Sequence, residues 1–482
     1  MGTSVMWFRR DLRLDDNPAL VEAASSGEVL ALFVLDPVLL AAAGAPRLAF
    51  LYRSLRALDE AIGGQLVVRH GDPVSVVPEV GRAVEAGAVF AAEDFGPYGR
   101  RRDRQLDLTL VGSSYAVSPG TITKADGTPY RVFTPFSRAW RQHGWPPPSP
   151  PVGPTAPAAR LRSPTWVRDV RSDRIPEDPQ IDLVLLAAGE AAARRRLDEF
   201  LTAGLDSYHQ DRNFADRPGT SRLSPYLKWG ALHPRTILRR LSDHEGSGRH
   251  RRSAGAAARP SAGVVDAFRS AGAEAFRLEL AWREFYADVL FNRPDSARRH
   301  WNSAFDSMPY ATGARATTRA EAWKAGRTGF PIVDAGMRQL LGEGWVHNRV
   351  RMIVASFFLK DLHLPWTVGA RHFMSHLVDA DLASNQHGWQ WVNGSGTDAA
   401  PYFRVFNPVT QGAKFDPSGA YVRRWVPELR GVPAEAIHDP ARLADVRSRL
   451  DAPAGLRDYP EPIVDHLRER AEALRRYQAT RA

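Results

Sequence analysis

The first part of the chain alternates short apolar runs with amphipathic segments. Five runs have the length and composition of buried strands: Ser4–Phe8, Val29–Leu35, Leu66–Arg69, Ala88–Ala92 and Tyr115–Ser118. Between them, the segments Arg47–Ile62 and Val74–Glu85 carry apolar residues at helical spacing. Strands that alternate with helices predict an α/β domain with a Rossmann-like parallel sheet covered by helices.

Helical periodicity dominates from Ala187 onward. The clearest helical segments are Glu190–Leu201, Ala273–Leu290, Pro331–Leu341, Asn348–Leu359 and Trp366–Leu377. The segment Glu245–Ala262 is rich in Gly, Ser, Ala and Arg and is typical of a surface loop. This part of the chain therefore predicts a larger all-α domain.

Proline fills the chain between these two regions, for example in the seven-residue stretch from Trp145 to Pro151. Proline favours extended backbone and disfavours helix, so this segment predicts an interdomain connector. The expected organisation is an α/β domain over residues 1–129, a connector over 130–186 and a helical domain over 187–482.

Composition adds a partner and a compartment to this picture. The net charge of +10 and the isoelectric point near 10.0 favour a polyanionic partner such as DNA, although a merely basic enzyme has the same balance. The 482 residues include no cysteine, which excludes disulfides and thiolate metal sites. The N-terminus runs directly into charged residues, and no apolar run is long enough to cross a membrane. We expect a cytoplasmic protein.

The residues with the most unusual chemistry gather between Trp345 and Phe406. Trp389 and Trp391 lie close together, and Asp379, Asp381 and Asn385 precede them by a few positions. Aromatic walls with a few polar groups suit a flat, partly polar ligand. The dinucleotide fingerprint GxGxxG is missing after the first predicted strand, so the sheet does not indicate an ordinary nicotinamide site.

Three other motifs can be explained by structural roles as well as by chemistry. His372 and His376 have the spacing of two metal ligands, but Phe373 replaces the glutamate of zinc peptidases, and we expect no metal. Asp379 and Asp381 are two positions apart, which points two side chains away from each other on a helix. The segment from Gly219 to Ser224 precedes a predicted helix and could bind phosphate or form an ordinary helix cap.

Collinear motifs give the chain a resemblance to the photolyase and cryptochrome family, most closely to bacterial class I photolyases for cyclobutane pyrimidine dimers. The motifs are MWFRRDLRLDDN from Met6, TPF from Thr134, GTSRLSPYLKWG from Gly219, WREFY from Trp282, GRTGFPIVDAGMRQL from Gly326, GWVHNRVRM from Gly344 and DLASNQHGWQW from Asp381. The resemblance covers nearly the whole chain. It implies an enzyme that uses blue light and FAD to repair ultraviolet-damaged DNA.

The resemblance also assigns cofactor contacts. The positions that hold the FAD phosphates and the adjoining groups fall on Tyr208, Thr220, Ser221, Arg222, Leu223 and Ser224. Those around the isoalloxazine ring fall on Asn348, Arg351, Asp379, Asp381 and Asn385. Asn385 is expected to face flavin N5, because a neutral amide can either accept from or donate to that atom.

A flipped-out dimer needs its own pocket, since a base inside a duplex cannot reach a buried flavin. The resemblance places Glu279, Trp282, Asn348, Met352 and Trp391 in this pocket, with Arg349 and Arg404 as phosphate clamps. Relatives that act on (6-4) photoproducts carry histidines where Asn348 and Met352 stand, so cyclobutane dimers are the expected substrate. The alternatives are a (6-4) photolyase, a cryptochrome-like photoreceptor and a binding protein without catalysis. We expect a monomer associated with the nucleoid.

Two features depart from the family pattern. Trp389 and Trp366 match the inner members of a tryptophan relay that reduces FAD, but the outer member falls on Tyr310, with Trp301 and Trp323 as other routes. The antenna site has Gly96 where folate-binding relatives have an acidic residue. The stretches around Asp36-Pro37 and Pro97–Asp103 favour 8-hydroxy-5-deazaflavin, with methenyltetrahydrofolate or an empty site as alternatives.

Overall fold

The computed structural model describes residues 2–25, 27–152, 165–253, 261–398 and 403–480. The chain packs as two compact units. The first comprises Met1–Ile181, Leu186–His209 and Ser221–Pro294, and the second comprises Asp182–Leu185, Gln210–Thr220 and Asp295–Ala482. These units divide the chain differently from the ranges 1–129, 130–186 and 187–482, which remain a prediction about domains.

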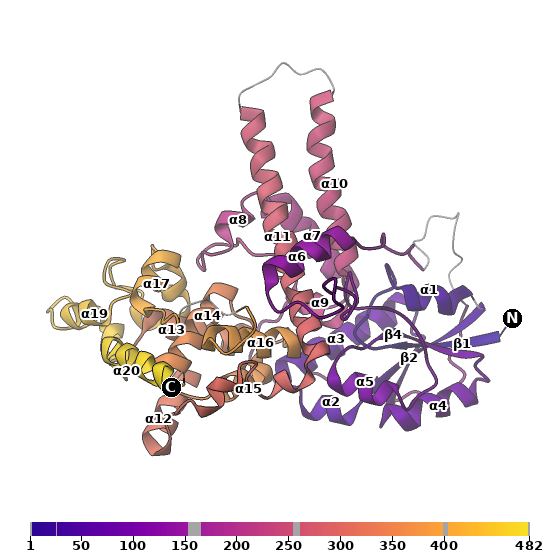
Figure 1. Cartoon of the computed structure of the whole chain (residues 1–482), viewed down its shortest axis with the longest axis horizontal. Coiled ribbons are helices and arrows are strands. Elements are labelled where there is room, and N and C mark those ends of the chain that lie inside the picture. Colours follow the sequence, from indigo (N-terminus) through magenta and orange to yellow (C-terminus); the bar gives the residue numbers. More distant parts are fainter. Residues whose placement is uncertain (1, 26, 153–164, 254–260, 399–402, 481–482) are drawn as a thin grey trace. The chain divides into compact units, whose positions relative to one another are not determined.

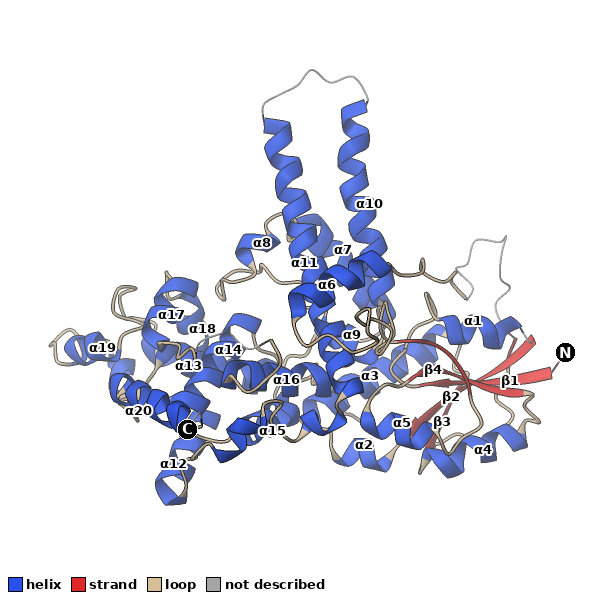
Figure 2. Ribbon diagram, viewed as in Figure 1, coloured by secondary structure: helices blue, strands red, loops and turns tan. Residues whose placement is uncertain are grey.

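A parallel sheet forms the centre of the first unit (Figures 1 and 2). Its strands are β1 (Gly2–Phe8), β2 (Gly27–Leu35), β3 (Leu66–His70), β4 (Ala88–Glu93) and β5 (Thr109–Ser113), in the order β3-β2-β1-β4-β5. The short strand β6 (Thr165–Trp166) pairs with the start of β2. All the pairings are parallel, as the alternation of strands and helices predicted.

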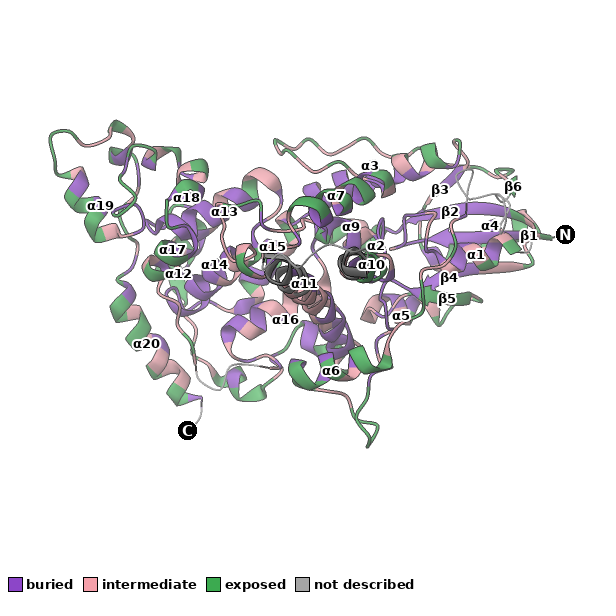
Figure 3. Cartoon of the chain, turned by 90° about the horizontal axis from the view of Figure 1, so that it is seen from above, coloured by how far each residue is buried: buried purple, intermediate pink, exposed green. Residues whose placement is uncertain are grey.

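Alternate residues of the strands pack against helices on opposite faces of the sheet. Met6 and Phe8 belong to a core that includes residues of α1 (Pro18–Ser25) and α3 (Ala45–Ala61). Val5 and Trp7 belong to another core, which includes residues of α4 (Pro73–Ala83). This two-residue period is the geometry of a strand that is buried on both faces, and Figure 3 shows the central strands in the colour of buried residues.

The remaining helices of the first unit are α2 (Pro37–Ala41), α5 (Pro97–Asp103), α6 (Phe133–His143), α7 (Glu190–Ala203), α9 (Ser224–Trp229), α10 (Pro234–Ser253) and α11 (Ser261–Asn292). Helix α8 (Tyr208–Asp211) lies at the boundary of the two units. Asp36 and Asp72 begin α2 and α4 by accepting the amides of Val38 and Val74. The Asp-Pro motifs at 36–37 and 72–73 thus have a structural role as helix starts.

The second unit is helical. Its helices are α12 (Gly313–Lys324), α13 (Pro331–Glu343), α14 (Asn348–Lys360), α15 (Trp366–His376), α16 (Leu382–Asn393), α17 (Pro408–Phe415), α18 (Ala420–Trp425), α19 (Pro440–Arg447) and α20 (His466–Ala479). Short 3-10 turns cover Pro294–Ala297 at the junction with the first unit, and Ser303–Ser307, Pro427–Leu429 and Ala454–Arg457 within the second. The parallel sheet with its covering helices and the helical second unit agree with the predicted fold class. No helix among the described residues combines the length and the apolarity that a membrane span requires.

Three local expectations were wrong. The fifth strand is Thr109–Ser113, and Tyr115–Ser118 is a buried loop. Helix α10 continues to Ser253 through part of the segment expected to be a loop, whose residues 254–260 lie outside the described ranges. Helix α6 lies inside the segment expected to be an extended connector, because its eleven residues precede the proline run.

Candidate functional site

Asn385 has its side-chain amide fixed by two acceptors. It lies on the first turn of α16, and its Nδ2 atom donates to the carbonyl of Ala370 at 3.1 Å and to Oε1 of Gln386 at 2.8 Å. Both partners are oxygens, which assigns the nitrogen to their side. The Oδ1 atom is therefore directed away from them as an acceptor for a donor such as a ring N–H.

Arg351 and Asp379 form an ion pair within the second unit. The Nη2 atom of Arg351 lies 2.8 Å from Oδ2 of Asp379, and Nε donates to the carbonyl of Val346 at 2.7 Å. The carboxylate side chain is 2% exposed and the guanidinium side chain is 25% exposed. The pair joins α14 to the turn between α15 and α16 and fixes one cation beside a buried anion.

Asp381 caps the helix that carries Asn385. Its Oδ1 atom accepts the amide of Ser384 at 3.1 Å, the usual bond of an N-cap aspartate. This bond positions the first turn of α16, which carries Asn385. It also removes the interpretation of Asp379 and Asp381 as an acid and base pair, because each carboxylate has a separate structural partner.

The first two turns of α14 carry Asn348, Arg349 and Met352. Asn348 is exposed, and Met352 is half-buried against the main core of the unit. Arg349 donates to Oδ1 of Asn213 at 2.6 Å, and its guanidinium carbon lies 4.5 Å from the ring centroid of Phe415. Part of its hydrogen-bonding capacity is thus used inside the unit, a contact that the sequence did not indicate.

Trp389 is enclosed by aromatic side chains. The ring is 3% exposed, and its centroid lies 5.1 Å from that of Phe373, 5.8 Å from that of Phe358 and 6.1 Å from that of Trp323. Gly369 provides the remaining space, since a Cβ atom there would lie 2.2 Å from the indole ring. Trp323, one of these neighbours, is fully buried. Its indole N–H donates to the carbonyl of Val354.

Trp366 and Tyr310 are connected through His300. The imidazole centroid lies 6.1 Å from that of Trp366, which is 1% exposed, and Nε2 lies 3.1 Å from the hydroxyl of Tyr310. Burial and the field of Asp306 raise the pKa of Tyr310 to about 12, against a hydrogen bond from Asn393. Sequence reasoning identified both ends of this connection and missed His300.

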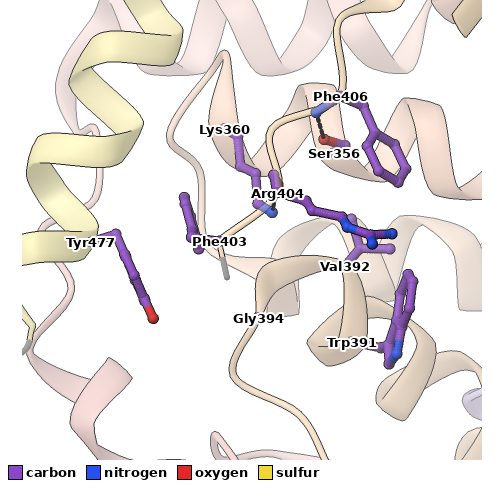
Figure 4. Close-up of a pocket in the computed structure, with 9 residues that line it drawn as sticks. All are labelled: Ser356, Lys360, Trp391, Val392, Gly394, Phe403, Arg404, Phe406 and Tyr477. Atoms are coloured by element: carbon purple, nitrogen blue, oxygen red, sulfur yellow. Dashed lines mark hydrogen bonds between the residues drawn. The ribbon is translucent and has the colours of Figure 1, made fainter. Parts of the chain in front are cut away.

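Trp391 and Arg404 line one pocket of the second unit (Figure 4). Figure 4 shows the guanidinium of Arg404 on the same side of the pocket as the indole of Trp391, with Phe403 and Tyr477 on the other side. The Nε1 atom of Trp391 donates to the carbonyl of Asp398 at 3.1 Å, which holds the ring in place. The structure brings these two predicted DNA contacts together.

Lys360 also lines this pocket. It is 3% exposed, donates to the backbone carbonyl of Arg404, and its Nζ atom lies 4.2 Å from the ring centroid of Phe403. Burial lowers its pKa to about 7. This lysine holds the segment that carries Arg404, and the sequence pattern did not single it out.

The predicted phosphate segment is divided between the two units, with Thr220 in the second and Ser221 to Ser224 in the first. Arg222 has a left-handed backbone with φ of 52°, and α9 begins at Ser224, as expected. The Ser221 carbonyl accepts from Nε of Arg196 at 2.8 Å. Leu223 is 1% exposed, so its side chain belongs to the core and only its backbone can serve a ligand.

Tyr208, the predicted upstream contact, packs inside the first unit. Its ring is 7% exposed and lies edge-on to Phe200 and Phe276, with centroids 5.4 Å and 5.3 Å away. This packing fixes the position of the residue at the start of α8.

Glu279 and Trp282 lie one turn apart on α11, both half-buried. The indole of Trp282 stacks on Phe133 with centroids 3.7 Å apart and an interplanar angle of 8°. The ring centroids of Phe285 and Tyr286 lie 5.7 Å and 5.3 Å from that of Trp282. One face of Trp282 is thus supported by Phe133, a residue that the sequence did not indicate.

The histidine pair on α15 is packed as a structural feature. The rings of His372 and His376 lie 4.2 Å apart, and Nδ1 of His376 contacts the carbonyl of His372 at 2.9 Å. Burial lowers the pKa of His372 to about 3. Across the described ranges, no group of three or more His, Cys, Asp or Glu side chains is arranged to hold a metal ion.

The chain matches known proteins over nearly its whole length. Residues 4–155 match the family model described as DNA photolyase, and residues 276–479 match that of the FAD binding domain of DNA photolyase. The deoxyribodipyrimidine photo-lyase of Halobacterium salinarum is 38% identical, covering 99% of each chain.

Two solved structures share the fold. A bacterial class III photolyase from Agrobacterium tumefaciens superposes with a TM-score of 0.83 at 35% identity, covering 100% of this chain and 98% of that one. An archaeal photolyase from Sulfolobus tokodaii with two FAD molecules superposes with a TM-score of 0.78 at 27% identity, covering 99% of this chain and 100% of that one.

Proposed function

Because the chain belongs to the DNA photolyase family, we propose how its residues carry out light-driven repair of DNA. The protein repairs cyclobutane pyrimidine dimers by electron transfer with FAD as its cofactor. The observation that carries this function is the agreement with a deoxyribodipyrimidine photo-lyase over nearly the whole of both chains. The residue roles below are proposals that rest on the geometry of each unit and on the family pattern.

The donor set of the second unit fits the polar edge of a flavin. Asn385 offers Oδ1 as an acceptor because both N–H bonds of its amide are used elsewhere. The Arg351 and Asp379 pair supplies fixed charge, which suits a ring whose electronics the protein must tune. When bound, FAD supplies the electron that splits the dimer after blue light is absorbed. Asp381 holds Asn385 in place from the helix cap.

We propose that Thr220, Ser221, Arg222 and Ser224 supply the phosphate contacts, as the family pattern assigns them. These residues supply hydroxyl, guanidinium and backbone N–H donors near the start of α9. Leu223 contributes its backbone because its side chain is buried, and the family pattern assigns Tyr208 as a further FAD contact.

For the lesion, we propose that Trp282 and Trp391 stack on the bases of the flipped-out dimer. Each indole has one part of its surface held, by Phe133 for Trp282 and by the Asp398 carbonyl for Trp391. A ring that is already held loses little conformational freedom when a base stacks on it.

The polar and flexible residues of the lesion pocket have matching roles. Glu279 and Asn348 hydrogen-bond the edges of the bases, and Met352 packs against them. We propose that Arg349 and Arg404 contact DNA phosphates, because a guanidinium group can donate paired hydrogen bonds to phosphate oxygens. Neither Asn348 nor Met352 can act as the proton donor that (6-4) repair needs, which supports the cyclobutane substrate.

Trp389, Trp366 and Tyr310 form the proposed route that brings electrons to FAD from outside. Tyr310 is half-buried and bonded to His300, which lies against Trp366. Trp323 offers a branch because its ring lies next to Trp389. We expect Tyr310→Phe to slow photoreduction, whereas an unchanged rate in Tyr310→Phe together with a slower rate in Trp323→Phe would assign the route to the branch.

The finer classification remains a proposal. We propose a class I enzyme with 8-hydroxy-5-deazaflavin as antenna, and the related structures supply two rival expectations. The Agrobacterium protein is named a class III photolyase, and the Sulfolobus protein carries a second FAD described as a novel light-harvesting cofactor. An absorption spectrum distinguishes these antennas. We further propose that the protein acts as a monomer on the nucleoid in the cytoplasm.

The proposed flavin contact is tested with a matched pair of variants. Asn385→Asp places a carboxylate against two acceptor oxygens and removes the neutral amide, so we expect at least tenfold slower repair and weaker FAD retention. Asn302→Asp makes the same chemical change at an exposed helix cap that aspartate serves equally well. Equal repair rates in the two variants would contradict the role of Asn385.

A further inference from the structure

His300 lies at the centre of a buried hydrogen-bond chain that the repair reaction does not use. Its Nε2 atom lies 3.1 Å from the hydroxyl of Tyr310, and its Nδ1 atom lies 2.8 Å from Oγ of Ser395. Ser395 is fully buried and accepts from Nδ2 of Asn393 at 2.9 Å. The imidazole is 9% exposed and lies against the ring of Trp366.

The partners of this chain indicate which ring nitrogen carries the proton. The Ser395 hydroxyl oxygen has two lone pairs, so it can accept from Asn393 and from Nδ1–H of His300 at once. The Asn393 side chain also hydrogen-bonds the phenol of Tyr310, which leaves the phenol O–H in need of an acceptor. Within the described part of the chain, Nε2 of His300 is the acceptor at hydrogen-bond distance.

The ionisation of the two groups is compatible with this arrangement. Burial lowers the pKa of His300, against the opposing field of Asp306, so the imidazole is neutral near pH 7. Burial and Asp306 raise the pKa of Tyr310 to about 12, so the phenol keeps its proton in the resting protein. Asp306 lies on the 3-10 turn Ser303–Ser307 and is the charged residue whose field reaches both groups.

We propose that His300 is the proton acceptor that allows Tyr310 to act as the outer electron donor. This inference rests on the proposed role of Tyr310. The geometry meets the requirement for general-base catalysis, because the base lies within about 2.6–3.2 Å of the oxygen whose proton it takes. A second ring nitrogen held by Ser395 keeps the imidazole in the required tautomer.

The step balances in electrons and protons. Light-excited oxidised FAD is the oxidant, and one oxidising equivalent reaches Trp366 by way of Trp389. Tyr310 then gives one electron to the oxidised indole of Trp366 and gives its O–H proton to Nε2 of His300. The products are a neutral tryptophan, a neutral tyrosyl radical and an imidazolium ion. Without His300, the phenol proton has no base within hydrogen-bond distance among the described residues.

The first test reads the tautomer in the dark and needs no catalytic turnover. Protein labelled with nitrogen-15 histidine is examined by NMR near neutral pH, where a protonated ring nitrogen and a lone-pair nitrogen have distinct shifts. We expect Nδ1 of His300 to be protonated and Nε2 to carry the lone pair. A protonated Nε2 in the resting protein would overturn the proposal. Comparison with His300→Gln assigns the signal among the 14 histidines.

The second test follows the tyrosyl radical by transient absorption after a laser flash. Glutamine keeps hydrogen-bonding capacity but takes no proton near neutral pH, so His300→Gln should lower the radical yield at least tenfold. In His300→Ala, added imidazole should restore part of the yield. The content of bound FAD in each variant checks that the site is intact.

The two possible failures are distinguishable. A wild-type radical yield in His300→Gln, when Tyr310→Phe abolishes the signal, would overturn the role of His300 and leave that of Tyr310 standing. The absence of any tyrosyl radical in the wild-type protein would overturn the proposed relay itself, and the role of His300 with it.

Discussion

Gly369 of α15 faces the indole of Trp389, and an added methyl group has no room there. A Cβ atom on Gly369 would lie 2.2 Å, 2.5 Å and 3.0 Å from three carbons of the benzo ring. Carbon atoms in contact stay about 3.5–4.0 Å apart, so the ring must move by about 1 Å. Trp323, Phe358 and Phe373 enclose the indole, so the movement also displaces its neighbours.

Two opposing terms set the size of the effect of Gly369→Ala. Overpacking a core costs about 1–3 kcal/mol, and three ring carbons at these distances favour the upper end. Alanine gains about 1 kcal/mol over glycine inside a helix. The expected net loss is about 2 kcal/mol, which lowers the unfolding temperature of a unit of this size by about 4–8 °C.

The assay is a double-mutant cycle with Trp389→Phe, measured by thermal unfolding followed by circular dichroism. Phenylalanine is shorter than tryptophan and vacates the volume that the new methyl group needs. Gly369→Ala should therefore cost about 2 kcal/mol in the wild-type background and close to nothing, or a small gain, in the Trp389→Phe background. The same loss in both backgrounds would refute the contact as its cause.

Three further outcomes follow from the geometry. Burial lowers the pKa of Lys360 to about 7 from 10.5, so the folded chain binds fewer protons than the unfolded chain between these values. The stability of the wild type relative to Lys360→Met should therefore rise from about pH 7 to about pH 10, and parallel urea midpoints across that range would contradict this. Phe133→Ala removes the ring stacked on Trp282, which should weaken binding of damaged DNA by about 2–12-fold in a gel-shift titration; unchanged affinity would show that the stack is not needed. Arg351→Met removes the cation from the buried carboxylate of Asp379 and should lower the free energy of unfolding by about 1–3 kcal/mol. The double variant R351M/D379N should recover part of this loss. Equal stability of the single and double variants would contradict the cost of the unpaired carboxylate.

Four strands, β1 to β4, were predictable from the sequence because each contains a run of apolar residues that is mostly buried. The runs at Ser4, Val29, Leu66 and Ala88 fall within the observed strands. Their pattern contains the necessary information, since a parallel sheet covered by helices needs no polar face.

The fifth strand, Thr109–Ser113, was missed because it is largely exposed, whereas the following loop, Tyr115–Ser118, is mostly buried and resembles a strand in the sequence. The amides of Ala116 and Val117 donate to the carboxylate of Glu284, which lies on α11 more than 160 residues later. Burial in this loop is therefore compatible with satisfied backbone groups and looks like a strand in the sequence. The composition of Glu245–Ala262 also hid the end of α10. There Glu245 pairs with Arg277 of α11 at 2.8 Å, a contact that the local sequence does not indicate.

The motifs located the residues of the site but did not indicate their supports. Asn385 follows from the family pattern, whereas the Ala370 carbonyl that orients its amide is a backbone atom with no sequence signature. Phe133 and His300 act through three-dimensional contacts with Trp282 and Tyr310. Neither partner has a sequence signature that links it to the residue it contacts, and only packing brings each pair together.

The most direct test of the central claim is a repair assay with the purified protein, its FAD reduced, and DNA that carries a thymine dimer. Blue light should restore intact thymines, and the same mixture kept in the dark should restore none. No restoration under blue light, with FAD bound at one per chain, would contradict the assignment of this protein as a repair enzyme.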